Sequence, residues 1–147
     1  MAGIRQLLGL GPDDRFPAER VGSVRLGTTV ATNALLERKG EPTVLVITKG
    51  FADALRIAYQ NRPRIFDRRI ILPEVLYERV IEADERIGAD GELIQPLNTE
   101  ALTGQLKAAY DDGFRGAAVV CMHGYRHPQH EAEIGRLARE AGCTQVA

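Results

Sequence analysis

The sequence predicts an α/β domain with a mainly parallel sheet, helices on both faces and one β-hairpin excursion. Two apolar runs, TVLVIT at 43–48 and AAVVCM at 117–122, are continuous rather than alternating, which is typical of strands buried on both faces of a parallel sheet. Segments with helical apolar spacing lie between them. Since parallel strands need crossover connections, this alternation predicts a sheet covered by helices.

Composition narrows the class of protein. The chain has 147 residues, 44% of them hydrophobic, enough for one domain with a core. With 19 basic and 20 acidic residues, it lacks the charge expected of a protein that binds nucleic acid or an anionic membrane, so we expect small-molecule partners. It has no membrane-length apolar run or signal peptide, which predicts a cytoplasmic location. Cys121 and Cys143 are expected to be buried packing residues.

The first third of the chain predicts helix, strand and helix. A short helix is expected around residues 4–8, and a strand over 21–26. Apolar residues within 31–35 then mark a second helix, with Arg38 and Lys39 in its last turn and Gly40 just beyond its end. The strand and this helix would form a strand, tight loop and helix unit.

The middle of the chain predicts a second such unit and a hairpin. The strand at 43–48 is followed by an apolar helical stripe over 51–58. Residues 60–73 carry charge and two prolines without periodicity, so we expect a long connection. Asp90-Gly91 lies between strand-like segments and predicts an antiparallel hairpin.

The last third predicts two helices around the second apolar run. One helix passes through 102–110 and ends at Gly113. Another has Pro128 in its first turn and Gly142 just after its end. Residues 143–147 resemble the start of a further strand that stops without a turn, and residue 1 leads almost directly into a helix. We therefore expect both ends of the chain to be cut from a longer protein.

The loop before residue 30 is a candidate anion site. Gly27 would let the backbone approach a ligand, Thr28 and Thr29 would add hydroxyl groups, and the helix that follows would add its free N–H groups. This chemistry suits a phosphate or a carboxylate. The alternative is structural: Thr29 caps the helix, Gly27 turns the chain, and Thr32 and Asn33 bond locally.

Four longer blocks resemble the N-terminal region of the hydantoinase A/5-oxoprolinase family. They read GTTVATNALLERKGE, ITKGFADALRIAYQNRPRIFD, PEVLYERVIEADERI and HGYRHPQHE. Within the family, ALRIAYQNRPRIFDRRI looks most like ATP-dependent 5-oxoprolinases, and less like N-methylhydantoinases or acetone carboxylase subunits. The resemblance implies opening of 5-oxo-L-proline to L-glutamate with ATP and Mg²⁺, a link to glutathione metabolism, and a partial actin-like, ribonuclease-H-like ATPase lobe.

The resemblance also implies missing parts. Family members usually begin with a hairpin that carries an Asp-Gly-Gly-Thr-type phosphate loop, and no such segment precedes Ile4; the second lobe would follow Ala147. We therefore expect an internal piece of the ATPase module that alone neither hydrolyses ATP nor opens 5-oxoproline. Its partners would be the cyclic-amide substrate, the rest of the parent enzyme and, through unpaired sheet edges, a second copy.

Charged residues offer a further substrate contact but no catalytic assignment. Arg62, with Arg64 beside it in QNRPR, could bind the carboxylate of 5-oxoproline through its guanidinium group. Alternatively it lies in a solvated loop or pairs with Asp67, Glu74 or Glu78. The acidic run over 82–92 resembles the solvent face of a hairpin more than an acid/base pair. No G-x-G-x-x-G, Walker A or nucleophile-elbow pattern occurs.

The three histidines fall within eight residues, close to Cys121. Their spacing matches no closed zinc pattern, so we predict no metal site, and a small metal-dependent hydrolase stays a minor alternative. His123 and Tyr125 are pocket candidates, because the carboxyl edge of a parallel sheet faces ligands. In the structural alternative His127 caps the following helix. The main rival to an enzyme is a noncatalytic α/β domain used for binding or assembly.

Overall fold

The computed structural model describes residues 5, 7–11, 14, 15, 17, 29–59, 66, 68–72 and 74–147. The chain divides into two compact units, Met1–Glu37 and Arg38–Ala147. Of the helix expected at 4–8 only residues 5, 7 and 8 are described, and the strand expected at 21–26 lies outside the described residues. No helix in the described part of the chain is both long and apolar enough to span a bilayer.

The helix α2, Val30–Leu36, ends earlier than predicted. Arg38, with φ at +53°, takes the left-handed position that the sequence assigned to Gly40, so the predicted end is wrong. Val30 and Leu36 are 70% and 76% exposed. A helix this short is marginal in water, and the left-handed conformation of Arg38 ends it.

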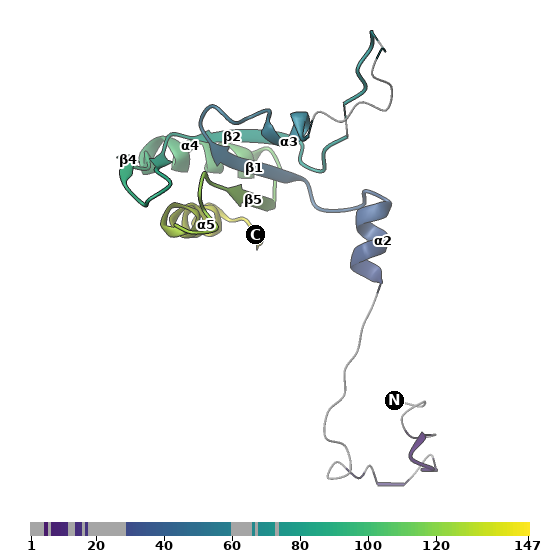
Figure 1. The fold of residues 1–147 in the computed structure, drawn as a ribbon. Helices are drawn as coiled ribbons and strands as arrows, with labels where there is room; N and C mark the ends of the chain where they lie inside the picture. The colour runs from purple at the N-terminus through teal and green to yellow at the C-terminus, as the bar shows by residue number, and fades with distance from the viewer. Residues whose placement is uncertain are drawn as a thin grey trace. The chain divides into compact units, whose positions relative to one another are not determined.

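The second unit is built on a four-stranded parallel sheet with strand order β2-β1-β5-β6 (Figure 1). The strands are β1 (Thr43–Thr48), β2 (Arg79–Ala83), β5 (Gly116–Val120) and β6 (Gln145–Val146). The helices are α3 (Ala54–Ile57), α4 (Thr99–Asp111) and α5 (Gln129–Ala141). The predicted α/β class, the strands at both apolar runs and the two C-terminal helices are confirmed.

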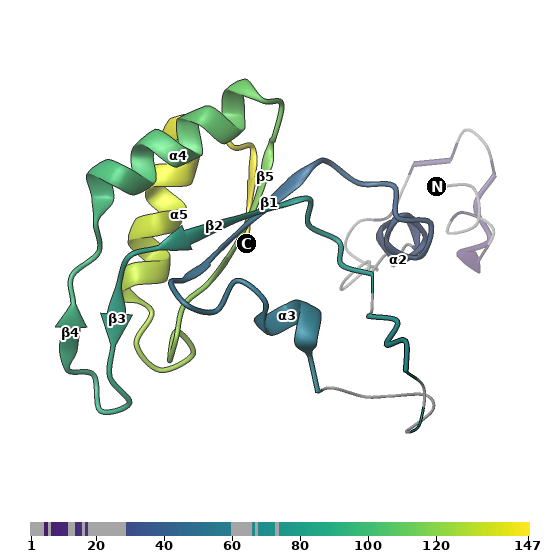
Figure 2. The same cartoon turned by 90° about the horizontal axis from the view of Figure 1, so that it is seen from above.

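The connections place two helices on one face of this sheet. The connection from β1 leads to β2, whereas those from β2 to β5 and from β5 to β6 lead the opposite way along the sheet. If all crossovers are right-handed, the first connection covers one face of the sheet and the other two cover the opposite face. Accordingly α4 and α5 contact each other on one face, and α3 follows β1 on the other (Figure 2). The loops after β1 and β5 therefore diverge, and ligands of such sheets bind at that position.

The core lies between the sheet and the α4–α5 pair. Val44 and Val46 of β1 belong to this core, whereas Leu45 and Ile47 are buried on the opposite face. Burial on both faces explains why β1 reads as an unbroken apolar run. The expectation that Cys121 and Cys143 are buried is confirmed, since they are 6% and 5% exposed and both belong to the core cluster.

The region between β1 and α4 differs in part from the prediction. The hairpin is confirmed, with β3 (Arg86–Ile87) antiparallel to β4 (Leu93–Gln95) around Asp90-Gly91. The segment before it is β2, a parallel strand beside β1 that hairpin reasoning missed. The helix expected over 51–58 is also too long, because α3 is a single turn with no buried residue.

Candidate functional site

Three neighbouring rows of core side chains end in polar atoms at the carboxyl edge of the sheet. On β1 the row Val44, Val46 ends at Thr48. After β2 the row Ile81, Ala83 ends at Glu85, and beyond β5 the row from Ala117 ends at Cys121. Since side chains alternate along strands, all three rows face the α4–α5 layer. Thr48, Glu85 and Cys121 are each at most 6% exposed.

Glu85 is the centre of a buried hydrogen-bond chain. The Thr48 hydroxyl donates to Glu85 Oε1 and accepts the Met122 N–H at 2.8 Å. Glu85 Oε2 lies 2.6 Å from Nδ1 of His130, on the first turn of α5. Both oxygens of a carboxylate that is only 2% exposed are therefore used. This chain joins the ends of β1, β2 and β5 to α5, and we call Thr48, Glu85 and His130 the edge network.

The next residue of α5 fixes the loop after β5. Glu131 Oε1 accepts the Cys121 N–H at 2.8 Å. A Cβ at Gly124 would collide with this carboxylate, so the backbone approaches it closely only because residue 124 has no side chain. His123, between them, has φ at +60°, a conformation that non-glycine residues rarely adopt. The loop is thus held in one shape from both sides.

The thiol beside the edge network is unreactive. Burial is the main cause that raises the pKa of Cys121 from its ordinary 9.0 to about 12, and the negative charges of Glu85 and Glu131 raise it further. Nucleophilic cysteines have lowered pKa values. Cys121 is therefore a packing residue at the site rather than a nucleophile.

The rim of the edge is charged and more open. Lys49 Nζ pairs with Asp84 at 3.2 Å, the Gly50 N–H donates to Glu82 Oε1 at 2.7 Å, and the Arg86 guanidinium donates to the Lys49 carbonyl at 3.0 Å. A hollow of about 340 Å³ adjoins this turn, lined by Glu82, Gly50 and residues of the α3 segment. Space for a ligand therefore exists beside the carboxyl end of β1.

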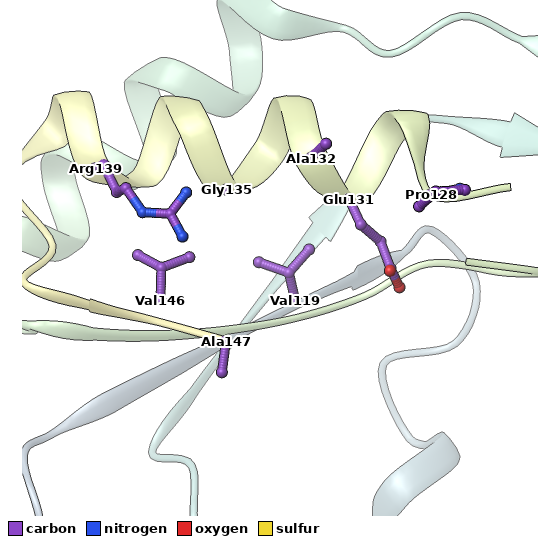
Figure 3. Close-up of a pocket in the computed structure, with 8 residues that line it drawn as sticks. All are labelled: Val119, Pro128, Glu131, Ala132, Gly135, Arg139, Val146 and Ala147. Atoms are coloured by element: carbon purple, nitrogen blue, oxygen red, sulfur yellow. The ribbon is translucent and has the colours of Figure 1, made fainter. Parts of the chain in front are cut away.

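A second hollow lies at the side of the sheet formed by its outer strand, β6. It has a volume of about 290 Å³ and runs between α5 and the strands β5 and β6. Glu131 and Arg139 lie toward opposite ends, and Val119 and Val146 line it from the sheet side (Figure 3). Its apolar lining offers few groups that could orient a polar substrate, so the edge network is the stronger candidate site.

The threonine-loop candidates are described only in part. Gly27, Thr28 and Arg62 lie outside the described residues, whereas Thr29 occupies the N-cap position of α2. Its side chain makes no capping hydrogen bond, so the alternative that its hydroxyl caps the helix is wrong. Thr32 and Asn33 are exposed.

The histidines do not converge on one point. His123 and Tyr125 lie in the loop at the carboxyl edge, as expected, with Tyr125 90% exposed. The expected capping by His127 is wrong, because Pro128 is the N-cap residue and the His127 ring bonds the carbonyl of Ala89 at 3.3 Å. Within the ranges that the structure covers, no three His, Cys, Asp or Glu side chains form a metal-sized group.

Sequence reasoning missed the edge network. It placed Glu85 on the solvent face of a hairpin, which is wrong, since this residue is buried. The available signal was the alternation of side chains along a strand. Glu85 falls in the same alternating row as Ile81, Ala83 and Ile87, all of which are buried. A charged residue in phase with a core row requires a partner, and His130 is that partner.

Comparison with known proteins gives a consistent result. Residues 1–142 match the family described as the hydantoinase/oxoprolinase N-terminal region. The chain is 43% identical to 5-oxoprolinase 1 of Arabidopsis thaliana, over 90% of this chain and 12% of that protein. It is 33% identical to the 5-oxoprolinase of Saccharomyces cerevisiae, over all of this chain and 14% of that one. It thus spans about an eighth of the length of these relatives.

Solved structures agree with the fold. An ATP-dependent caprolactamase from Pseudomonas jessenii superimposes with a TM-score of 0.67 at 27% identity, covering 99% of this chain and 21% of that one. A nucleotide-free acetone carboxylase gives a TM-score of 0.61 at 20% identity, covering 74% and 17%. The neighbours support a partial actin-like lobe.

Proposed function

The chain belongs to the hydantoinase/oxoprolinase N-terminal-region family, and from that premise we propose that it is part of an ATP-dependent enzyme that opens 5-oxo-L-proline to L-glutamate. The observation that carries the proposal is the 43% identity to a 5-oxoprolinase over 90% of the chain. The caprolactamase that shares the fold is also ATP-dependent and is named for a cyclic amide. As the chain covers only about an eighth of its relatives, the activity belongs to the longer protein.

The chemistry requires an activated carbonyl. A lactam carbonyl is a poor electrophile, and ATP supplies the phosphoryl group that activates it. This chain would contribute hydrogen-bond donors: we assign Gly27, Thr28 and Thr29 to the phosphate or to a substrate oxygen, with Thr32 and Asn33 nearby in sequence. The Thr29 hydroxyl makes no capping bond and suits this role. Within the part of the chain that the structure describes, no three His, Cys, Asp or Glu side chains form a group that could hold Mg²⁺.

The substrate would meet the carboxyl edge of the sheet. We propose Arg62 as the partner of the 5-oxoproline carboxylate, because a guanidinium group binds a carboxylate through two parallel hydrogen bonds. His123 and Tyr125 would line the same region. His123 supports this through its φ of +60°, since strained backbone is concentrated at functional sites.

The test is turnover by the full-length protein. We expect release of glutamate and ADP from 5-oxoproline and ATP with Mg²⁺, and none from the 147-residue chain alone. The double variant Thr28→Val, Thr29→Val should lower kcat/KM at least 100-fold, as loss of oxyanion-type donors does. Thr103→Val is the matched control, because this half-buried residue of α4 bonds only the Thr99 carbonyl of its own helix. A double variant within a few-fold of wild type would remove the threonine loop from the mechanism.

A second activity has one observation in its favour. The gamma subunit of acetophenone carboxylase from Aromatoleum aromaticum is 30% identical over 90% of this chain. A carboxylase-type subunit would hydrolyse ATP in response to a ketone and bicarbonate rather than to a cyclic amide. Comparing ADP release with 5-oxoproline, a hydantoin and a ketone separates the candidates in one assay.

A further inference from the structure

The His130 imidazole has one nitrogen engaged and one available. Nδ1 lies 2.6 Å from Glu85 Oε2, and a carboxylate oxygen accepts hydrogen bonds, so Nδ1 carries the proton in the neutral ring and Nε2 is an acceptor. Nε2 makes no hydrogen bond to the described part of the chain. Since no buried side-chain nitrogen or oxygen there lacks a partner, Nε2 is reached by solvent. The side chain is 13% exposed.

The position of this pair favours chemistry over packing. An apolar residue at position 85 would continue the core row of Ile81 and Ala83, whereas a buried carboxylate is costly unless it is fully bonded. Glu85 orients His130 from the side away from solvent, as the carboxylate of a catalytic dyad does. The pair lies where the loops after β1 and β5 diverge, the ligand position in parallel sheets.

We propose that His130 is the proton-transferring residue for ring opening and that Glu85 is its positioning residue, an inference that rests on the function proposed above. Water adds to the activated carbonyl carbon: its oxygen bonds to the carbon and one proton passes to His130 Nε2. That proton then passes to the ring nitrogen as the carbon–nitrogen bond breaks. The hydroxyl proton is released to solvent, and the carbon keeps the phosphoryl-bearing oxygen as an acyl phosphate. A second water hydrolyses this acyl phosphate to the carboxylate and inorganic phosphate.

The central experiment uses His130→Gln in the full-length enzyme. The glutamine amide can still donate to Glu85 but provides no base. We expect glutamate formation to fall 100- to 10,000-fold, while 5-oxoproline-dependent ADP release in a single turnover keeps at least half its wild-type amplitude. His127→Gln is the matched control, since His127 bonds a carbonyl outside the edge network; it should stay within threefold of wild type. Thermal unfolding of both variants reports their folding separately from activity.

The outcomes separate the two proposals. A folded His130→Gln enzyme that forms glutamate within threefold of wild type, or that loses ADP and glutamate formation together, overturns this inference alone. A wild-type enzyme that opens no cyclic amide overturns the proposed function and this inference with it. If His130→Gln does not fold, His130→Ala with added imidazole replaces it: at least tenfold restoration by imidazole supports the role, and no restoration overturns it.

Glu85 gives an independent measurement. Because it acts through His130, Glu85→Gln should lower kcat 10- to 100-fold, as loss of an orienting partner does. KM for 5-oxoproline should stay within threefold. A change in KM with unchanged kcat would remove Glu85 from the positioning role.

Discussion

At the scale of single residues, the informative side chains are those that break a core pattern. Glu85 stands in phase with Ile81 and Ala83, and Thr48 stands in phase with Val46. The sequence therefore contained the signal for both, but it could not supply the partner: His130 lies 45 positions after Glu85, on a different element. Which face of a strand a residue occupies can be predicted from a single sequence. Which distant residue it contacts can be predicted only when the order of the strands and helices is known.

Thr48 tests how much the edge network contributes to stability. Thr48→Val should lower the free energy of unfolding by about 1–3 kcal/mol, because it leaves the Met122 N–H and one Glu85 oxygen without their partner. Thr103→Val removes a hydroxyl that bonds only the Thr99 carbonyl and should change it by less than about 0.5 kcal/mol. Urea unfolding followed by circular dichroism measures both. Equal effects would contradict a buried, coupled network.

Cys121 tests the electrostatics of the site. With its pKa raised to about 12, mainly by burial, the native thiol forms roughly a thousandfold less thiolate at pH 8 than an unfolded one. Alkylation by iodoacetamide, located by mass spectrometry, should therefore be much slower at Cys121 in the native protein than in urea. Burial also raises the pKa of Cys143, so its native thiol should likewise react more slowly than in urea. Equal rates in native and unfolded protein would refute this.

The same raised pKa predicts loss of stability in alkali. The unfolded chain releases the Cys121 proton from about pH 9, whereas the folded chain keeps it until about pH 12. The contribution of the protonated thiol to the free energy of unfolding is therefore complete below pH 9 and decreases between pH 9 and pH 12. Cys121→Ala should make the free energy of unfolding less dependent on pH in that window. Urea titrations at pH 8 and pH 10 measure the free energy of unfolding of both proteins. The same change between the two pH values in wild type and Cys121→Ala would contradict this prediction.

At the scale of elements, prediction succeeded where a segment is buried and failed where it is not. The stripe of α5 and its end at Gly142 followed from the sequence because Ile134 and Ala138 pack in the core. The stripe at 51–58 has the same spacing, but α3 buries none of its residues and forms one turn. Spacing shows what a helix could bury, and only the tertiary structure decides whether it does.

Two glycines, one at the end of a helix and one inside a helix, give a matched test of what an added Cβ does to stability. Gly142 ends α5 at φ +111°, and a Cβ there would lie 2.5 Å from the Tyr110 ring. Gly142→Ala should therefore lower the free energy of unfolding by about 2 kcal/mol or more. Gly104 lies exposed within α4 with nothing near its Cβ position, so Gly104→Ala should raise it by about 0.5–1 kcal/mol. Chemical denaturation checks the signs, and the same sign for both would contradict this account.

At the scale of the whole molecule, the parallel class was predictable because β1 and β5 are each a continuous apolar run. The strand order was not, since β2 lies in a charged stretch that reads as part of the hairpin. The candidate site depends on that order. Only when β2 is beside β1 and α5 lies on the same face as α4 do Thr48, Glu85 and His130 meet.

The division into two units leads to the last prediction. Every residue of the described core cluster, from Val44 to Cys143, lies in the second unit, as do all four strands of the parallel sheet. A polypeptide of residues 38–147 should therefore unfold cooperatively, with a free energy within about 1 kcal/mol of that of the 147-residue chain, since unfolding cooperativity follows the core. All four tyrosines lie within it, so tyrosine fluorescence and circular dichroism can be compared directly. Coincident urea transitions are expected, whereas a broad or probe-dependent transition would show that the first 37 residues complete the core.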